Sequence, residues 1–410
     1  MRRLPALRLA AVVAVGVASW ATAACGSTAT SSSQRGSPTP CASAQGGHSC
    51  ATAHTPIAST PSVSANAAAQ LFLSLFVPEP SAGSGTYFYG VTCVSASECW
   101  ATGTTQLLTQ ALIEEFDGTS WKIAVKDASA SYIYGSACVS ADDCWAVGTA
   151  TTTSAPVPRP IIMHFTGQAW TPVASPAVSD GGFFSVSCPS SSECWAAGDQ
   201  TTGSTQLPLI ELYSGGVWTI ASTPSQPGNA QLQGIACPAS DDCWAVGSPG
   251  DSGPALIEHY DGATWTTAAS PSINGLQSSS DAEGELKSVT CLAPSDCWAV
   301  GDVTSHGATV SQFLAEHWDG SAWAVVSAPM PAGQGQLASL DSVSCASATD
   351  CWAVGGQVIE QYTGSSWALI NAPWFNNGSA LAITCLSSGD CWAVGSSRTA
   401  GPFAATNGPT

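Results

Sequence analysis

The chain has 410 residues, with 28 acidic side chains against 9 basic ones and a formal net charge of −19. Nucleic acids and anionic membrane surfaces select basic footprints, so this charge argues against both as partners. Charged residues make up only 9% of the chain, and Gly, Ser, Thr, Ala and Pro dominate, which favours many short strands and tight turns over helices.

Residues 1–25 are predicted to be an export signal. A basic start, Met1 to Arg8, precedes an apolar run, Leu9 to Val17, that is too short to span a bilayer. The small residues before Cys25 resemble a bacterial lipobox, although Thr22 stands where Leu is usual. We therefore predict lipidation of Cys25, which would anchor the protein to a membrane only through this lipid. Ordinary cleavage near Ala21 to Ala24, with release of the protein, is the alternative.

Residues 26–66 are predicted to be a disordered stalk. They consist mainly of Ser, Thr, Pro and Ala and contain too few apolar side chains to bury a core. Cys41 and Cys50 are available to pinch a small loop within the stalk.

Residues 67–410 carry one motif seven times: a cysteine, five residues, a second cysteine and then Trp-Ala-Val-Gly or a close variant. Successive copies begin 40 to 54 residues apart, which is the period of solenoids, propellers and arrays. Local, evenly repeated cysteine pairs in an exported chain predict disulfides. Zinc is the rival ligand, but it needs four ligands at short spacing, and the six histidines lie at irregular places. The predicted pairs are Cys93 with Cys99, Cys138 with Cys144, Cys188 with Cys194, Cys237 with Cys243, Cys291 with Cys297, Cys345 with Cys351, and Cys385 with Cys391.

Each repeat contains four apolar runs of strand length. In the fourth copy the first run ends at Cys237, the second starts at Cys243, and the third and fourth flank Asp261-Gly262. Glycine after a short polar residue supplies the positive φ of a tight hairpin. Four consecutive antiparallel strands per repeat predict a propeller blade, so the fold class is all-β, a seven-bladed β-propeller.

The two ends of the repeat region predict how the ring closes. The seventh copy stops near Asn407-Gly408 with three strands, while residues 74–80 form a strand-like run without a preceding blade. Together they complete a closing blade built from both termini, and we expect a monomer. A right-handed stack of repeats, which would not need this closure, is the alternative.

Over residues 70–410 the chain resembles a family of secreted bacterial propeller-repeat proteins with repeats of the form SVSCxSxxDCWAVG followed by LIEHWDGxxW. The resemblance implies a propeller fold and export. It implies no activity, because this family has no agreed biochemical function.

Repeated side chains are expected to build the scaffold. Two tryptophans per blade are predicted to form the core between blades. They are Trp100, Trp145, Trp195, Trp244, Trp298, Trp352 and Trp392 after the second cysteine, and Trp121, Trp170, Trp218, Trp265, Trp323 and Trp367 on the fourth strand. A glutamate recurs on the third strand of five copies and is expected to make a structural hydrogen bond. It is Glu114, Glu211, Glu258, Glu316 and Glu360, with Met163 and Ala404 in the remaining copies.

An acidic residue precedes the second cysteine in every copy. It could form a sevenfold ring that binds a cation or a basic partner, or it could accept backbone N–H groups within its own turn, which we favour. One acid per blade does not supply the converging oxygens that calcium needs, so we expect neither metal nor cofactor. The acids are Glu98, Asp143, Glu193, Asp242, Asp296, Asp350 and Asp390.

Binding is expected from residues outside the repeat pattern. Trp374 and Phe375 are large aromatics in the stretch APWFNNGS, and residues 271–287 form the longest predicted inter-blade loop. The predicted binding residues are Trp374, Phe375, Asp281, Glu283, Glu285, Tyr89 and Tyr134.

These patterns favour an exported, lipid-anchored binding module at the cell surface whose partner is a surface protein or a glycan. The alternative is a glycan-active or glycoconjugate-active hydrolase or lyase on the same scaffold, which would need an acid/base pair in the central face. The sequence contains no recognisable catalytic constellation, so the binding module is preferred.

Overall fold

The computed structural model describes residues 86–410 except 106–109, 128–131, 153–154, 177–179, 227, 251–252, 274–281, 306–310, 332–338, 371–377, 398–400 and 408–410. All of them belong to one compact unit, Ser62–Thr410. The predicted leader with Cys25, the stalk and the predicted closing strand at residues 74–80 lie outside the described residues.

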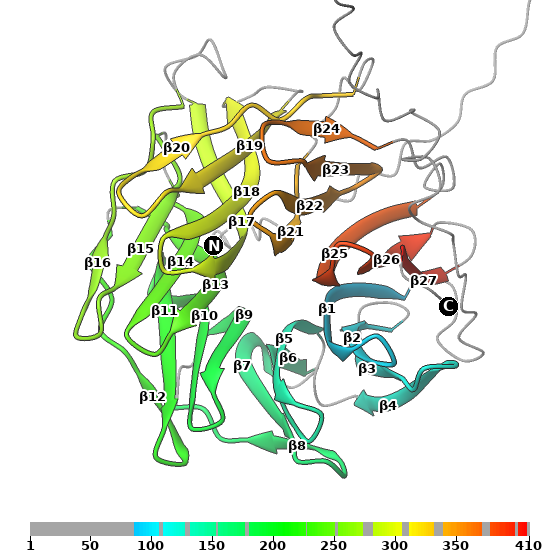
Figure 1. Ribbon diagram of the computed structural model, residues 1–410. Coiled ribbons are helices and arrows are strands. Elements are labelled where there is room, and N and C mark those ends of the chain that lie inside the picture. Colours follow the sequence, from blue (N-terminus) through cyan, green and yellow to red (C-terminus); the bar gives the residue numbers. More distant parts are fainter. Residues whose placement is uncertain are drawn as a thin grey trace, which may run out of the picture. The chain divides into compact units, whose positions relative to one another are not determined.

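The described residues form seven antiparallel sheets arranged around a central axis (Figure 1). Six sheets have four strands and the seventh has three described strands. Within each sheet the strands pair in chain order, because every connection is a hairpin between neighbours. The predicted all-β, seven-bladed propeller is therefore confirmed, and we number the blades 1 to 7 along the chain.

The first three blades contain twelve strands. Blade 1 holds β1 (Tyr87–Ser95), β2 (Glu98–Thr104), β3 (Ala111–Phe116) and β4 (Trp121–Asp127). Blade 2 holds β5 (Tyr132–Ser140), β6 (Asp143–Thr152), β7 (Ala155–Phe165) and β8 (Trp170–Val173). Blade 3 holds β9 (Gly181–Ser190), β10 (Glu193–Thr202), β11 (Thr205–Ser214) and β12 (Val217–Ile220).

The remaining blades follow the same order. Blade 4 holds β13 (Gln231–Ala239), β14 (Asp242–Ser248), β15 (Leu256–Tyr260) and β16 (Trp265–Thr267). Blade 5 holds β17 (Ala282–Ala293), β18 (Asp296–Ser305), β19 (Ser311–Trp318) and β20 (Trp323–Val325). Blade 6 holds β21 (Ser342–Ser347), β22 (Asp350–Gly355), β23 (Val358–Tyr362) and β24 (Trp367–Leu369). Blade 7 holds β25 (Gly378–Ser387), β26 (Asp390–Ser397) and β27 (Gly401–Thr406).

The hairpin between the third and fourth strands follows the predicted Asp-Gly chemistry. Gly262 has φ 87°, a left-handed conformation that L side chains rarely adopt. The carboxylate of Asp261 accepts the backbone N–H groups of Ala263 at 3.0 Å and Thr264 at 2.9 Å. The aspartate therefore closes the turn from its side chain, and the glycine lets the chain reverse.

All seven predicted disulfides are present, each joining the first and second strands of one blade, with Cα atoms 3.9 to 4.1 Å apart. In every pair the second cysteine is buried, so each bridge ties the turn to the interior of its blade.

The predicted tryptophan core lies between blades. Trp298 of blade 5 meets Trp367 of blade 6 edge to face, and the same arrangement recurs at five other junctions with centroids 5.3 to 5.8 Å apart. All thirteen repeated tryptophans are buried, which confirms their assignment to the core.

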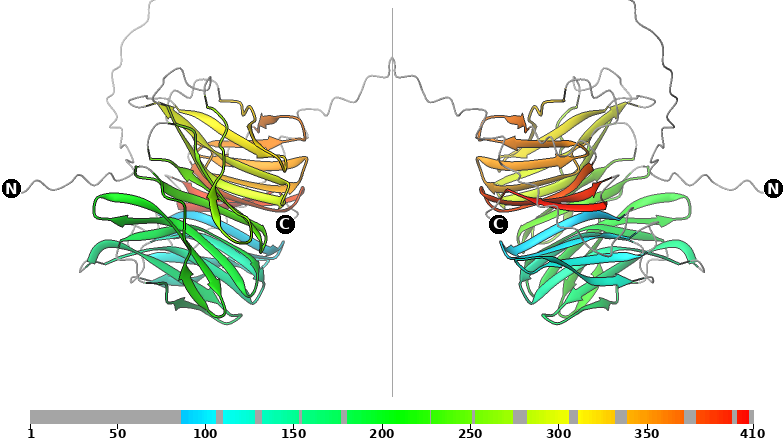
Figure 2. Two further views of the ribbon diagram at one scale, coloured as in Figure 1. Left: turned by 90° about the vertical axis from the view of Figure 1, so that its left-hand side faces the viewer. Right: turned by 90° about the vertical axis from the view of Figure 1, so that its right-hand side faces the viewer.

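The ring closes through side chains of the first and last blades. Trp392 of blade 7 packs against Phe116 and Trp121 of blade 1 in one apolar cluster with Phe88 and Ala382. Figure 2 shows the blue strands of blade 1 beside the red strands of blade 7. The junction between blades 7 and 1 therefore has the same tryptophan pair as five other junctions, which excludes an open stack of repeats.

Candidate functional site

The innermost strand of every blade lines a central channel with a cavity of about 280 Å³. Three residues before each first cysteine stands a small residue, because the next inner strand passes close by. A Cβ on Gly90 would lie 2.6 Å from the carbonyl oxygen of Tyr134. Where the residue is serine, its hydroxyl accepts a backbone N–H of the next blade, as from Val343 to Ser288 at 3.2 Å. The small residues are Gly90, Gly135, Ser185, Gly234, Ser288, Ser342 and Ala382.

One residue earlier on each inner strand, the side chain differs from blade to blade. These seven positions lie four residues before the first cysteine, and all of them line the cavity. They are Tyr89, Tyr134, Phe184, Gln233, Lys287, Asp341 and Leu381. We call these seven residues, together with Glu285 and Asp302 beside Lys287, the channel mouth.

Blades 1 to 3 contribute an aromatic half of the mouth. The ring centroids of Tyr89 and Tyr134 lie 5.3 Å apart, and those of Tyr134 and Phe184 also 5.3 Å apart, in tilted contacts. Burial raises the pKa of Tyr134 to about 12 and raises the pKa of Tyr89 as well. Both phenols are therefore neutral at physiological pH and present an uncharged aromatic surface.

Blades 4 to 6 contribute a polar, charged half. Lys287 Nζ lies 3.1 Å from Asp341 Oδ1 on the next blade and 3.7 Å from Asp302 Oδ1 on its own blade. Burial by itself would lower the pKa of Lys287, but the carboxylates of Asp341, Asp302 and Glu285 outweigh it and raise the pKa. Burial also raises the pKa of Glu285, whose carboxylate accepts the amide of Gln233. One ammonium ion thus stands among three carboxyl groups.

A belt of amides and acids surrounds this half. Gln206 donates to Asp199 at 2.6 Å and to the side chain of Gln231 at 3.2 Å, which reaches Glu285 at 3.5 Å. The belt crosses blades 3 to 5, and its glutamine amides donate hydrogen bonds to neighbouring side chains. Burial raises the pKa of Asp199.

The structure brings three predicted binding residues together, since Tyr89, Tyr134 and Glu285 all belong to the mouth. Glu283 lies two residues before Glu285 and accepts the Ser248 hydroxyl at 2.5 Å. Trp374, Phe375 and Asp281 lie outside the described residues, so their placement stays a prediction.

The assignment of residues 271–287 to a loop was wrong at its end. Strand β17 begins at Ala282, and Glu283, Glu285 and Lys287 point to one side while Ala282 and Leu286 are buried on the other. This period-two alternation is the pattern of a strand with one covered face. Glu283 and Glu285 therefore lie on the innermost strand of blade 5 and not in a loop.

Sequence reasoning missed six residues of the mouth: Phe184, Gln233, Lys287, Asp302, Asp341 and Leu381. Five of them share with Tyr89 and Tyr134 the position four residues before the first cysteine. This common offset was a usable signal, since residues at one offset in every blade meet around one axis.

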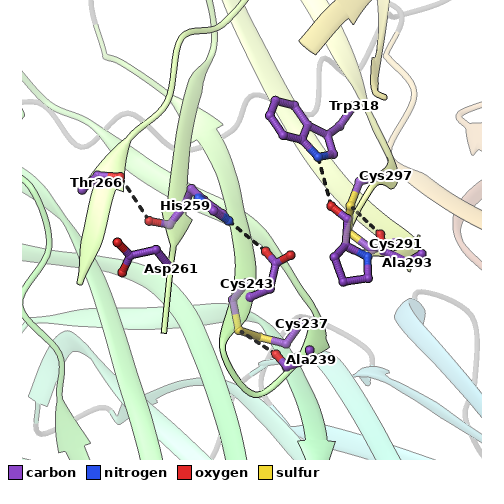
Figure 3. Close-up of polar contacts among 12 residues, drawn as sticks. Cys237, Ala239, Cys243, His259, Asp261, Thr266, Cys291, Ala293, Cys297 and Trp318 are labelled. Carbon is purple, nitrogen blue, oxygen red and sulfur yellow. Dashed lines mark hydrogen bonds and ion pairs between the residues drawn. A yellow bond between two sulfur atoms is a disulfide. The ribbon is translucent and has the colours of Figure 1, made fainter. Parts of the chain in front are cut away.

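The acids before the second cysteine lie at the other end of the same blades, and five of the seven bond to a side chain instead of the predicted backbone N–H groups. Figure 3 shows His259 of the third strand together with the Cys237–Cys243 disulfide of the same blade. Asp242 Oδ1 lies 2.8 Å from Nε2 of this histidine, and the imidazole ring stacks on Trp244 with centroids 4.1 Å apart. The reason is the register, which pairs Trp244 with His259 and so brings Asp242, two residues before Trp244, within reach of the histidine ring. Equivalent side-chain partners are His164 for Asp143, His317 for Asp296, Gln361 for Asp350 and Trp195 for Glu193.

These five acids are thus paired within single blades. Among the described residues no group of three or more His, Cys, Asp and Glu side chains is placed to hold a metal ion. The same residues include no helix that is long and apolar enough to cross a membrane.

The third-strand glutamates are fully buried where the structure describes them. Glu211 accepts the Ser175 hydroxyl at 2.8 Å, and Glu258 accepts the Gln226 amide at 3.1 Å. Both donors come from the segment after the fourth strand of the preceding blade, so these two bonds link neighbouring blades. They confirm the predicted structural hydrogen bond at Glu211 and Glu258, whereas neither carboxyl oxygen of Glu360 has a partner among the described residues.

Comparisons with known proteins show the fold. No family model matches the chain, and no curated protein matches its sequence. Similar solved structures include YCF48 bound to D1 peptide, at 13% identity and TM-score 0.52, covering 82% of this chain and 95% of that one. The Cps50 (Swd1) β-propeller domain of Myceliophteria thermophila matches at 10% identity and TM-score 0.52, covering 80% and 98%.

The extracellular domain of a hybrid two component system from B. thetaiotaomicron also matches. Its identity is 12% and its TM-score 0.53, over 82% of this chain and 39% of that one. At such identities the likeness establishes a β-propeller and nothing about what this chain binds.

Proposed function

We propose that the protein is an exported binding module that receives its ligand at the channel mouth. The observation that carries this proposal is the contrast between two neighbouring positions of the inner strands. Three residues before the first cysteine, only Gly, Ser and Ala occur, whereas one residue earlier the chain presents Tyr, Phe, Gln, Lys, Asp and Leu. Identical backbone positions that carry different side chains around one cavity are the arrangement of a specific site on a repeated scaffold.

Seven disulfides support export, because such bridges form and persist in oxidising compartments. Anchoring through a lipid on Cys25 completes the proposal, with residues 26–66 as the spacer. Mass spectrometry of the mature N-terminus tests this part, since an unmodified terminus near Ala24 would contradict the anchor.

The binding site is tested with the full mature chain on arrays of glycans and purified cell-surface proteins. Each hit is measured again with Tyr134→Ala, which alters the mouth, and with Ile220→Ala, which alters an exposed apolar residue of β12. We expect Tyr134→Ala to weaken binding at least tenfold and Ile220→Ala to leave it unchanged. Full binding by both Tyr134→Ala and Phe184→Ala would place the site elsewhere.

Trp374 and Phe375 are proposed to add aromatic contacts to the same ligand. Trp374→Ala is expected to weaken binding with little change in melting temperature. Unfolding of this variant, or full retention of binding, would contradict a role in recognition.

A second candidate, a glycan-active enzyme, is favoured by one feature of the mouth. Asp302 and Asp341 share Lys287, and burial raises the pKa of nearby Glu285 above its ordinary range, as a general acid requires. Chromogenic glycosides discriminate the two functions. Turnover that is lost in Glu285→Gln would establish an enzyme, whereas a binding module releases no product.

A further inference from the structure

The proposed function leaves the ligand's chemistry open, and the mouth itself restricts it. Lys287 is the only cation among the described residues that line the cavity, and its nearest charged neighbours are the carboxyl groups of Asp341, Asp302 and Glu285. Glu283 and Asp199 add further acid to the surrounding belt. The polar half therefore carries more negative than positive charge, on a chain whose overall charge is −19.

The hydrogen bonds within the polar half favour a positively charged ligand over a neutral ligand that would have to replace these bonds. Gln233 and Gln231 both donate to Glu285, and Lys287 donates to Asp341. A neutral polyol would have to displace these bonds and repay them. A cation can instead approach the free lone pairs of the carboxylates and balance their excess charge.

The opposite wall provides a second attraction for a cation. Tyr89, Tyr134 and Phe184 form a continuous aromatic surface facing the same cavity. Cations are attracted to aromatic faces, and guanidinium groups both stack on them and bind carboxylates in a bidentate manner. An ammonium ion offers a point charge without this planar fit, so the combination of walls suits arginine best.

The cavity has room for one long side chain. Its volume of about 280 Å³ lies at the lower end of the roughly 300–1,000 Å³ that is typical of ligand pockets. The main chain that carries this side chain would remain outside, on the face where the inner strands begin.

We propose that the channel mouth receives an arginine side chain presented by an exposed segment of a basic partner protein. This inference rests on the proposed function, and it adds the chemical class of the partner. The excess acid of the whole chain would steer such a partner toward the mouth, so association is faster at low ionic strength.

The test uses immobilised peptides of sequence Gly-Ser-Gly-X-Gly-Ser-Gly, with X as arginine, lysine, citrulline or glutamate, and the full mature chain in solution. Surface plasmon resonance is expected to show at least tenfold tighter binding to arginine than to citrulline, with lysine between them and no binding to glutamate. Equal binding to arginine and citrulline would overturn the proposal, because citrulline keeps the shape and loses the charge.

Substitutions in the channel mouth test whether the arginine peptide binds there. Glu285→Gln is expected to weaken arginine binding at least fivefold, and Tyr134→Leu is expected to weaken it similarly through loss of the aromatic face. Lys287→Gln should tighten it, since it removes the competing cation while keeping a donor for Asp341. Asp261→Asn is the matched control at the other end of blade 4, with the same charge change and a side chain that can still close its turn.

The outcomes separate the two proposals. If no peptide binds but a neutral ligand from the arrays is lost in Tyr134→Leu, the arginine inference fails and the binding site stands. If arginine binding is unchanged in both Glu285→Gln and Tyr134→Leu, the mouth does not receive the side chain. Melting temperatures of all variants show that a loss of binding is not a loss of folding.

Discussion

Trp298 of blade 5 and Trp367 of blade 6 meet at an interplanar angle of 85°, with ring centroids 5.3 Å apart. Trp298 also stacks on His317 of its own blade, so it contacts aromatic side chains of both blades. The junction between blades thus depends on one fully buried side chain that both neighbours contact. Edge-to-face geometry of this kind adds to the free energy gained by burial.

Replacing Trp298 is expected to destabilise the whole ring. Trp298→Leu removes the aromatic pair and leaves a cavity, which costs about 3 kcal/mol of the free energy of unfolding. Urea unfolding of the mature chain measures this loss. Ile220→Ala, an exposed substitution on β12, serves as the control and should stay within about 0.5 kcal/mol of the unmodified protein. A Trp298→Leu protein as stable as this control would contradict the proposed role of the junction.

The disulfide of one blade should contribute independently of the mouth. Replacing both Cys237 and Cys243 by alanine leaves the turn of the folded state at the same length. It removes a constraint from the unfolded chain, whose conformational entropy therefore rises. The chain-entropy model gives a loss of about 2 kcal/mol for so short a loop. Denaturant midpoints with and without reductant measure it. Identical midpoints for the double variant and the unmodified protein would show that the bridge constrains nothing.

The sixth blade lacks a donor that the third blade has. Ser175 follows β8 and donates to Glu211 at 2.8 Å, whereas Ala328 stands at the same distance after Trp323. Neither carboxyl oxygen of Glu360 has a hydrogen-bond partner among the described residues. Ala328→Ser is therefore expected to stabilise the protein by about 1 kcal/mol, because a buried acceptor gains a partner.

Thermal unfolding of Ala328→Ser tests this expectation. Ser327→Ala, one residue earlier and exposed, is the matched control and should change little. A melting temperature for Ala328→Ser at or below that of the unmodified protein would contradict the equivalence of the two junctions.

Stability should fall as the pH rises from about 5 to 8.5. Burial raises the pKa of Glu211 and Glu258 to about 7 and of Glu316 and Glu360 to about 8, from an ordinary value of 4.5. Because the unfolded chain releases these protons first, the stabilisation is complete below pH 4.5 and is lost as the pH rises through 8.

The variant Glu360→Gln isolates one of these groups. It cannot ionise, so the difference in stability between pH 5 and pH 8.5 should shrink by at least about 1 kcal/mol. Calorimetry at both pH values measures the difference. An unchanged pH dependence would mean that Glu360 does not titrate in this range in the folded protein.

Residues 74–80 are predicted to supply the fourth strand of blade 7, whose described part has three strands. Deleting residues 70–80 should lower the melting temperature of the whole domain, because β27 would lose its partner at the outer edge. Deleting residues 30–60 of the predicted stalk is the control and should leave it unchanged. Equal melting of the two deletions would show that the ring closes without this strand.

The sequence by itself determined the features that act within one blade. The cysteine pairs, the Asp261-Gly262 hairpin and the alternation around Trp244 are all local, since each joins residues that lie within about thirty positions of one another. Seven copies of these signals repeat the same information, so the all-β propeller and its disulfides could be predicted without coordinates.

Only the tertiary structure decided which residues meet at the channel mouth. Tyr134 and Lys287 belong to blades that are far apart in the chain, and Lys287 finds Asp341 because adjacent inner strands turn the same position toward one axis. Likewise, the register of β14 against β15, and not the turn sequence, gave Asp242 its histidine partner. Local sequence patterns determine each strand and hairpin, whereas closure of the ring determines the distances between blades. The candidate site depends on those distances because its residues come from different blades.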